Sequence, residues 1–107
     1  MPSQVQFSRG KSSTTLRGTL RRDEQKEYAL TARAGQRLTC RLTVTLPHSL
    51  RLTLSDASGH EVPLQSQDAH QWMSTLPETG EYTLTVARLP MQRPAPSIYA
   101  LFVTLRR

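Results

Sequence analysis

The sequence predicts an all-β protein, an antiparallel β-sandwich of about eight short strands with no significant helix. Apolar and polar residues alternate along most of the chain, whereas the spacing typical of an amphipathic helix is nearly absent. Turn-forming Gly, Pro and Asp residues separate the alternating segments. The 107-residue chain is 36% hydrophobic but only 6% aromatic, which suits a thin Leu- and Val-rich core between two sheets. We therefore expect a single domain over residues 1–107, with residues 1–4 disordered.

The N-terminal half of the chain contains the first four predicted strands. A polar turn at residues 9–13 separates the first two, and the second contains Gly18, which indicates a bulge or a close approach of the backbone to another group. A charged loop at residues 21–26 precedes the third strand, and Pro47 ends the fourth. The expected strands cover residues 5–7, 16–20, 28–32 and 38–46, and the last is expected to be the longest of the chain.

Four further strands are predicted in the C-terminal half. Residues 56–59, Asp-Ala-Ser-Gly, match the residue preferences of a turn, and a Pro-rich loop over residues 90–96 precedes the last strand. Trp72, the only tryptophan, lies among turn residues. We interpret it as a plug at one end of the sandwich, with a stacking platform for a sugar ring as the alternative. The expected strands cover residues 50–54, 62–64, 81–89 and 99–105.

Residues 76–80, Leu-Pro-Glu-Thr-Gly, match a sortase-type sorting signal as well as a tight turn. Such a signal requires an apolar, membrane-spanning stretch of roughly 18 residues immediately downstream. Glu81, Arg88, Arg93 and three prolines interrupt the sequence there, so no membrane span is expected. We therefore interpret the segment as a turn that leads into a strand.

The net charge of +6 comes mainly from arginines that are spread along the whole chain. A basic protein can bind nucleic acid, acidic lipid or an acidic protein. The sequence has no RNP-like or helix-turn-helix pattern, which argues against a nucleic-acid partner. We interpret the arginines as solvated residues on the outer faces of strands, and we keep binding to a polyanion as an alternative hypothesis.

No arrangement of residues predicts catalysis, so we expect a protein that is not an enzyme and that uses no cofactor. The five glycines are isolated, which excludes a nucleotide-binding glycine loop. His60 and His70 each have a carboxylate nearby in sequence, but their spacing is not that of metal ligands, and no metal site is predicted. Cys40 is the only cysteine, so an internal disulfide is excluded. Its position in phase with apolar residues indicates a buried, inert thiol rather than a nucleophile.

The order of several segments resembles a known family. These segments are Phe-Ser-Arg-Gly-Lys-Ser-Ser at residues 7–13, Gly18, Tyr28, Ala-Gly-Gln at residues 34–36, the Leu-Pro-x-Thr-Gly-x-Tyr element at residues 76–82, and Tyr99. Together they resemble the periplasmic inhibitors of goose-type (g-type) lysozyme, within the wider group of bacterial pre-peptidase C-terminal (PPC-like) β-sandwich domains. The resemblance covers the chain from Phe7 onward, and the Gly-x-Ser-Ser stretch at residues 10–13 favours the inhibitor branch.

The resemblance implies a protein without cofactor that inhibits g-type lysozyme by inserting loops into its peptidoglycan-binding groove. Loop arginines would bind carboxylates of the catalytic cleft. Arg93 is the best candidate because flanking prolines stiffen its loop, and Arg88 is a weaker one because it could also be the outward residue of a strand. The residues expected to contact lysozyme are Arg93, Arg88, Met91, Gln92, Arg22, Asp23, Glu24, Gln25, Ser12 and Ser13.

Two other functions remain open at this point. A PPC-like domain without inhibitory activity would bind carbohydrate or assist a secreted partner, with Trp72 or Tyr28 in contact with a sugar. A polyanion-binding protein would lose affinity more steeply with salt than an inhibitor whose loops fill a cleft. The resemblance implies a periplasmic or secreted location. Residues 1–4 have neither the basic start nor the apolar core of a signal peptide, so we expect either a cytosolic protein or a leader that the given sequence does not include.

Overall fold

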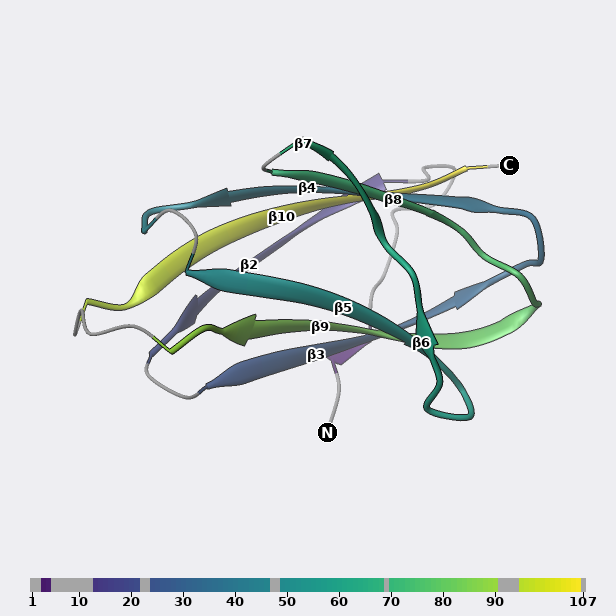
Figure 1. Ribbon diagram of the computed structural model, residues 1–107, viewed down its shortest axis with the longest axis horizontal. Helices are drawn as coiled ribbons and strands as arrows, with labels where there is room; N and C mark the ends of the chain where they lie inside the picture. Colours follow the sequence, from purple (N-terminus) through teal and green to yellow (C-terminus); the bar gives the residue numbers. More distant parts are fainter. Residues whose placement is uncertain are drawn as a thin grey trace.

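The computed structural model describes residues 3–4, 13–21, 24–46, 49–68, 70–90 and 95–106, which form a β-sandwich (Figure 1). Two five-stranded sheets pack face to face: sheet A has the order β1-β3-β9-β5-β6, and sheet B has the order β2-β10-β4-β8-β7. No helix occurs in these ranges. The strands are β1 (Ser3–Gln4), β2 (Ser13–Leu20), β3 (Gln25–Ala32), β4 (Arg37–Val44), β5 (Leu50–Asp56), β6 (Glu61–Val62), β7 (Gln65–Asp68), β8 (Gln71–Thr75), β9 (Gly80–Arg88) and β10 (Ser97–Arg106).

Strand pairing confirms the predicted all-β antiparallel sandwich. Among the described residues, the parallel pair of β1 with β3 is the exception to an otherwise antiparallel arrangement. From β2 onward, the chain passes from one sheet to the other at the connections β2–β3, β3–β4, β4–β5, β6–β7, β8–β9 and β9–β10. The loops after β2, β4 and β9 therefore each join the two sheets.

The core lies between the sheets, where the sequence alternation places it. In β9, Tyr82, Leu84 and Val86 are at most 2% exposed. Glu81, which directly precedes Tyr82, is exposed. Inward residues of β3, β4, β5 and β10 complete the same cluster. Its largest fully buried side chains are Tyr82, Leu30, Leu38, Leu54, Leu76, Leu84, Leu101, Val86 and Val103.

The Leu-Pro-Glu-Thr-Gly segment at residues 76–80 is a turn, as predicted, and it is fastened to the turn at residues 33–36. The Gly35 amide donates to the Leu76 carbonyl at 2.8 Å. The hydroxyl of Tyr82, buried at the start of β9, donates to the Glu78 carbonyl at 2.6 Å. The tyrosine of the Pro-x-Thr-Gly-x-Tyr element therefore stabilises the turn, which is a structural role for this element.

Some expected boundaries were wrong. β10, with 10 residues, is the longest strand, whereas β4 has 8 and ends at Val44. β10 is long because β2 and β4 pair with it on both sides along its length. Trp72 lies inside β8, paired with Cys40, rather than among turn residues. Ser3 and Gln4, which were expected to be disordered, form β1 through backbone pairing that no apolar pattern indicates.

Gly18 allows a tyrosine ring to lie against the backbone of β2, which confirms the close approach predicted there. A Cβ atom at Gly18 would lie 2.6 Å from the Tyr99 hydroxyl oxygen and 2.8 Å from its Cζ. The Tyr99 hydroxyl is hydrogen-bonded to the Tyr28 hydroxyl at 2.6 Å, and both side chains are buried. This tyrosine pair joins sheet B to sheet A through the core.

Candidate partner-binding end of the sandwich

The two loops predicted to bind a partner lie at the same end of the sandwich, at the left of Figure 1. Strands β2 and β9 end there, and strands β3 and β10 begin there. Leu20 at the end of β2 pairs with Ser97 at the start of β10 in sheet B. In sheet A, Gln25 at the start of β3 pairs with Ala87 near the end of β9. Residues 21–24 and 89–96 therefore connect the same two sheets at one end.

Arg88 joins these two loops from inside. Its side chain is only 8% exposed, so the expectation that it faces outward was wrong. Its guanidinium Nη1 donates to the Ala95 carbonyl at 3.0 Å and lies 3.4 Å from the Leu20 carbonyl, which it also bonds. The two carbonyls belong to the ends of different loops. Arg88 consequently supports both loops and is not available as a surface contact.

Backbone bonds and two buried serines extend this network. The Arg88 amide donates to the Glu24 carbonyl at 3.0 Å, and the Leu89 amide donates to the Ser49 carbonyl at 2.8 Å. The Ser49 hydroxyl donates to the Leu46 carbonyl at 2.6 Å and is hydrogen-bonded to the Ser97 hydroxyl, also at 2.6 Å. Three connections at this end are thus held to one another, which limits the conformational entropy that binding would remove.

The sequence analysis did not single out Ser49 or Ser97 as functional residues. Both are completely buried, and serine is a common surface residue, so its type gives no indication of burial. The alternation of the sequence could have indicated the burial of Ser97, because Ser97 stands two residues before Tyr99 and so faces the same side of β10 as the inward residues. Ser49 satisfies the Leu46 carbonyl at the base of the candidate site, and Ser97 is the hydrogen-bond partner of the Ser49 hydroxyl.

The structure places two of the expected contact residues on the exposed rim of this end. Glu24 accepts a hydrogen bond at its Oε1 from the Arg21 amide at 2.6 Å, and its own amide donates to the Arg21 carbonyl at 3.1 Å. These bonds close a tight turn between the sheets. Gln25 follows as the first, exposed residue of β3. Both side chains are therefore accessible to a partner that approaches the loop end.

Ser13 lies at the other end of the sandwich. It is the first residue of β2 and pairs with Thr104, whereas the loops follow Leu20 at the far end of the same strand. Seven residues of extended chain separate these positions by about 24 Å. The structure therefore does not bring Ser13 together with the loops. The other expected contact residues, Ser12, Arg22, Asp23, Met91, Gln92 and Arg93, lie outside the described residues.

The described residues offer no arrangement for acid–base or metal chemistry. Nowhere in these ranges do three or more His, Cys, Asp or Glu side chains gather as a metal site requires. His60 lies 3.9 Å from the Asp56 carboxylate, but its side chain is 83% exposed on a hairpin between β5 and β6. Asp56 accepts bonds from the Ser58 and His60 amides, so its role is to shape that turn.

Cys40 is completely buried in β4, as the sequence predicted, and burial raises the pKa of its thiol from 9.0 to about 12. The thiolate is the reactive form of cysteine, and at pH 8 it is almost absent in the folded protein. Trp72, on the inner face of β8, is partly buried and packs against the same core, but it pairs with Cys40 within β4 rather than closing an end of the sandwich as predicted. Tyr28 is only 4% exposed and cannot stack on a sugar.

The pKa of Cys40 predicts alkaline destabilisation. The folded state retains a proton that the unfolded state releases above its own pKa near 9, so this contribution to stability is complete below pH 9 and is lost as pH rises toward 12. Each pH unit in this window removes up to about 1.4 kcal/mol. Tyr99, whose pKa burial also raises, adds to the loss in the same direction. Urea unfolding at several pH values measures the effect.

The matched control for this prediction is Cys40→Ala, which should be less stable at pH 7 but lose less stability between pH 9 and pH 11 than the wild type. Ellman's reagent should react with Cys40 only after denaturant is added. Rapid reaction in native buffer at pH 8, or parallel pH profiles for the two proteins, would contradict the assignment.

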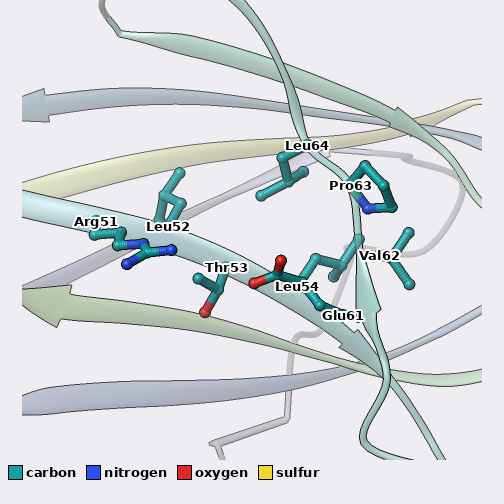
Figure 2. Close-up of a pocket in the computed structure, with 8 residues that line it drawn as sticks. All are labelled: Arg51, Leu52, Thr53, Leu54, Glu61, Val62, Pro63 and Leu64. Carbon is teal, nitrogen blue, oxygen red and sulfur yellow. The ribbon is translucent and has the colours of Figure 1, made fainter.

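A shallow groove lies along the edge of sheet A (Figure 2). It has a volume of about 170 Å³ and separates β5 from the segment through Pro63 and Leu64. Exposed Arg51 and Glu61 stand at its rim. Pockets that enclose small ligands usually measure roughly 300–1,000 Å³. The groove is therefore too small to enclose a sugar, and it contains none of the expected contact residues.

Several solved structures have the same fold as this chain. PliG of Aeromonas hydrophila, a periplasmic inhibitor of g-type lysozyme, superposes with a TM-score of 0.82 over 98% of this chain and 96% of that chain, at 22% identity. The chain has the PliG fold. PliG of Salmonella Typhimurium gives a TM-score of 0.75 at 18% identity, over 98% of this chain and 97% of that chain. The resemblance stated from the sequence is thus confirmed at the level of fold.

The chain is also similar in fold to a domain of a collagenase. The pre-peptidase C-terminal domain of a Bacillus anthracis collagenase superposes with a TM-score of 0.70 at 14% identity, over 97% of this chain and 95% of that chain. No protein-family model and no curated protein matches the sequence. The structural neighbours are inhibitors or accessory domains rather than enzymes. None of the described segments forms an apolar helix of the length that crossing a bilayer requires.

Proposed function

We propose that this protein is a periplasmic inhibitor of g-type lysozyme that inserts the loops at residues 21–26 and 88–96 into the peptidoglycan-binding groove. The observation that carries the proposal is the match to PliG inhibitors over 98% of this chain. The described bases of both loops lie at one end of the sandwich, which supports it, because a groove can receive two loops only if they start from the same end. The buried Arg88 network supports it further by holding the bases of these loops in place.

Each part of the proposed contact has a physical role. Arg93 would donate charge-assisted hydrogen bonds to cleft carboxylates, and Pro90, Pro94 and Pro96 reduce the entropy that ordering its loop costs. Glu24 and Gln25 would form polar contacts at the rim, together with Arg22 and Asp23, and Met91 and Gln92 would contribute to the packed centre. Arg88 acts from behind these residues. Ser13 lies at the opposite end of the sandwich and is not included in this contact.

The first test is a turbidity assay of cell-wall lysis with g-type, chicken-type and invertebrate-type lysozymes in parallel. Selective and stoichiometric protection against the g-type enzyme is expected. If a micromolar excess of this protein over the g-type enzyme gives no protection, then the protein shares the fold of PliG but not its inhibitory activity.

Arg93→Ala should raise the inhibition constant at least tenfold, which corresponds to about 1.4 kcal/mol, the value of one charge-assisted contact. The expected result includes an unchanged thermal unfolding midpoint, because the change lies in a loop. The matched control is Arg37→Ala, an exposed arginine that pairs with Arg106 at the opposite end of the sandwich from the loops, which should leave inhibition unchanged. Equal inhibition constants for the Arg93 variant and the wild type would remove Arg93 from the contact.

The alternative is a PPC-like module that binds carbohydrate or assists a secreted partner, and the similarity to the collagenase domain favours it. The sugar-stacking residues once considered for it are less suitable than expected, since Tyr28 is buried and Trp72 packs against the core. A titration with peptidoglycan fragments, in which the fluorescence of Trp72 is measured, tests this alternative. A saturable change without lysozyme inhibition would favour it over the inhibitor.

A further inference from the structure

The arginines that are scattered along the sequence gather on the outer face of sheet B. Arg17 lies in β2, Arg37 and Arg41 lie in β4, and Arg106 ends β10; all are exposed. These three strands are adjacent in the order β2-β10-β4, as Figure 1 shows. None of their residues is Asp or Glu. The acidic position of the sheet is Asp68, on the far edge strand β7. The centre of this face therefore carries positive charge without compensating carboxylates.

Two large apolar side chains are exposed in the middle of the same face. Phe102 is 46% exposed and Ile98 is 52% exposed, and both belong to the central strand β10. Phe102 pairs directly with Arg41 on one side, and Ala100, two residues away on the same face, pairs with Arg17 on the other. The small side chain of Ala100 separates Phe102 from Ile98. The face thus has an apolar stripe, Ile98–Ala100–Phe102, between two arginines.

The dimensions of this stripe match a thin ligand. β2 and β4 both neighbour β10, so Arg17 and Arg41 arise from strands about 10 Å apart. Arg37 lies four residues from Arg41 along β4, which places the two residues about 14 Å apart. In an extended single strand of nucleic acid, this distance is close to that between a phosphate and the second phosphate after it. A single nucleic-acid strand can place a base on the ring of Phe102 while its phosphates meet the flanking guanidinium groups. Exposed Thr15, Thr19 and Thr43 add hydroxyl groups around the stripe.

Other occupants fit the arrangement less well. A second copy of the chain that presented the same face would oppose arginine to arginine. A bilayer would have to receive Phe102 beyond the charged groups, yet arginine side chains are longer than phenylalanine and reach further from the sheet. We propose that the outer face of sheet B is a binding surface for single-stranded nucleic acid, read without sequence specificity through Phe102, Arg17 and Arg41. This proposal is independent of the loop end and of lysozyme inhibition.

The test is fluorescence anisotropy with a labelled oligothymidylate of about twelve nucleotides, measured over a range of salt concentrations. Saturable binding is expected, with log K falling against log salt at a slope of roughly −1.4 to −2.8 if two to four phosphates are neutralised. The double variant Arg17→Ala, Arg41→Ala should bind at least tenfold more weakly and reduce the magnitude of the slope by about 1.4. Phe102→Ala should weaken binding at least fivefold without changing the slope, because stacking releases no counterions.

The control variant is Arg51→Ala, which removes the same charge from the outer face of sheet A and should change affinity less than twofold. Circular dichroism and thermal unfolding establish that each variant is folded. Phe102→Tyr should retain binding. Equal affinity for a duplex, for poly-L-glutamate or for phosphatidylglycerol vesicles would overturn the proposal and indicate a surface that recognises charge alone. Loss of affinity in the arginine variants with no effect of Phe102→Ala would overturn it in the same way.

Discussion

Arg88→Ala should lower the free energy of unfolding by about 3 kcal/mol and loosen both loops at the candidate site. The variant removes the donor to the Leu20 and Ala95 carbonyls and also removes the aliphatic stem that fills the surrounding space. The Leu20 carbonyl is buried, and losing its donor costs roughly 1–3 kcal/mol, whereas the partly exposed Ala95 carbonyl can bond to water instead. Urea unfolding measures the loss of stability. Inhibition of g-type lysozyme should weaken as well, because loops that are no longer held must be ordered on binding.

Two substitutions separate packing from hydrogen bonding at this position. Arg88→Met retains most of the stem but no donor, and Arg88→Lys retains the charge and a donor on a shorter reach. Both should be more stable than the alanine variant, and neither should reach the wild type. Trypsin provides a local readout at the first loop, since Arg21 and Arg22 are cleavage sites there, whereas the bond between Arg93 and Pro94 resists trypsin. Cleavage there should be faster in all three variants. Unchanged cleavage rates together with wild-type stability would show that Arg88 does not support the loops.

The position of Arg88 shows what alternation can predict and what it cannot. Tyr82, Leu84 and Val86 are correctly predicted to face inward, and Arg88 continues the same phase. The sequence therefore contained the signal for its burial. Its charge argued for the opposite orientation, because a buried guanidinium is rarely stable without partners. The partners are backbone carbonyls of two loops distant in sequence, and only the folded arrangement reveals that they converge.

The same limit applies to the arginines of sheet B. Alternation predicts that Arg17 and Arg41 face outward, and the structure agrees. Nothing in the linear sequence indicates that β10 lies between their strands, because β10 comes last in the chain. Strand order is set by long-range pairing, so residues far apart in sequence become neighbours only through the topology. Arginines that are scattered along the sequence can therefore form one basic face in the folded protein. The linear sequence shows only that they are scattered.

Of the candidate site, the sequence located the loops but not their relationship. The resemblance placed the contact residues in two loops and near Ser13, and the structure brings the bases of the loops together while leaving Ser13 at the opposite end. The loops could be predicted because their prolines and charges interrupt the alternation. The distance to Ser13 could not, since it depends on the length and direction of β2. A short motif therefore supported the family resemblance without belonging to the same surface.

Gly18→Val should lower the free energy of unfolding by about 3 kcal/mol, near the upper end for overpacking. The new Cβ atom would meet the Tyr99 ring, whose Oη, Cζ and Cε1 atoms all lie within 2.9 Å of its position. The ring has little freedom to withdraw, because it is 3% exposed and its hydroxyl is held by Tyr28. Gly18→Ala places a Cβ atom at the same point and should cost roughly 1–3 kcal/mol. Urea unfolding of both variants measures the two losses.

A double-mutant cycle with Tyr99 tests whether this contact is the cause. Tyr99→Leu removes the atoms that a side chain at position 18 would meet, so Gly18→Ala should cost much less in that background than in the wild type. Tyr99→Phe should not provide the same relief, because Cζ and Cε1 remain at 2.8 and 2.9 Å. Thr19→Val is the control: it places a branched apolar side chain on the exposed face of β2 and should change stability by less than about 0.5 kcal/mol. If Gly18→Ala were equally costly in both backgrounds, strain in the β2 backbone rather than the tyrosine ring would have to explain the requirement for glycine.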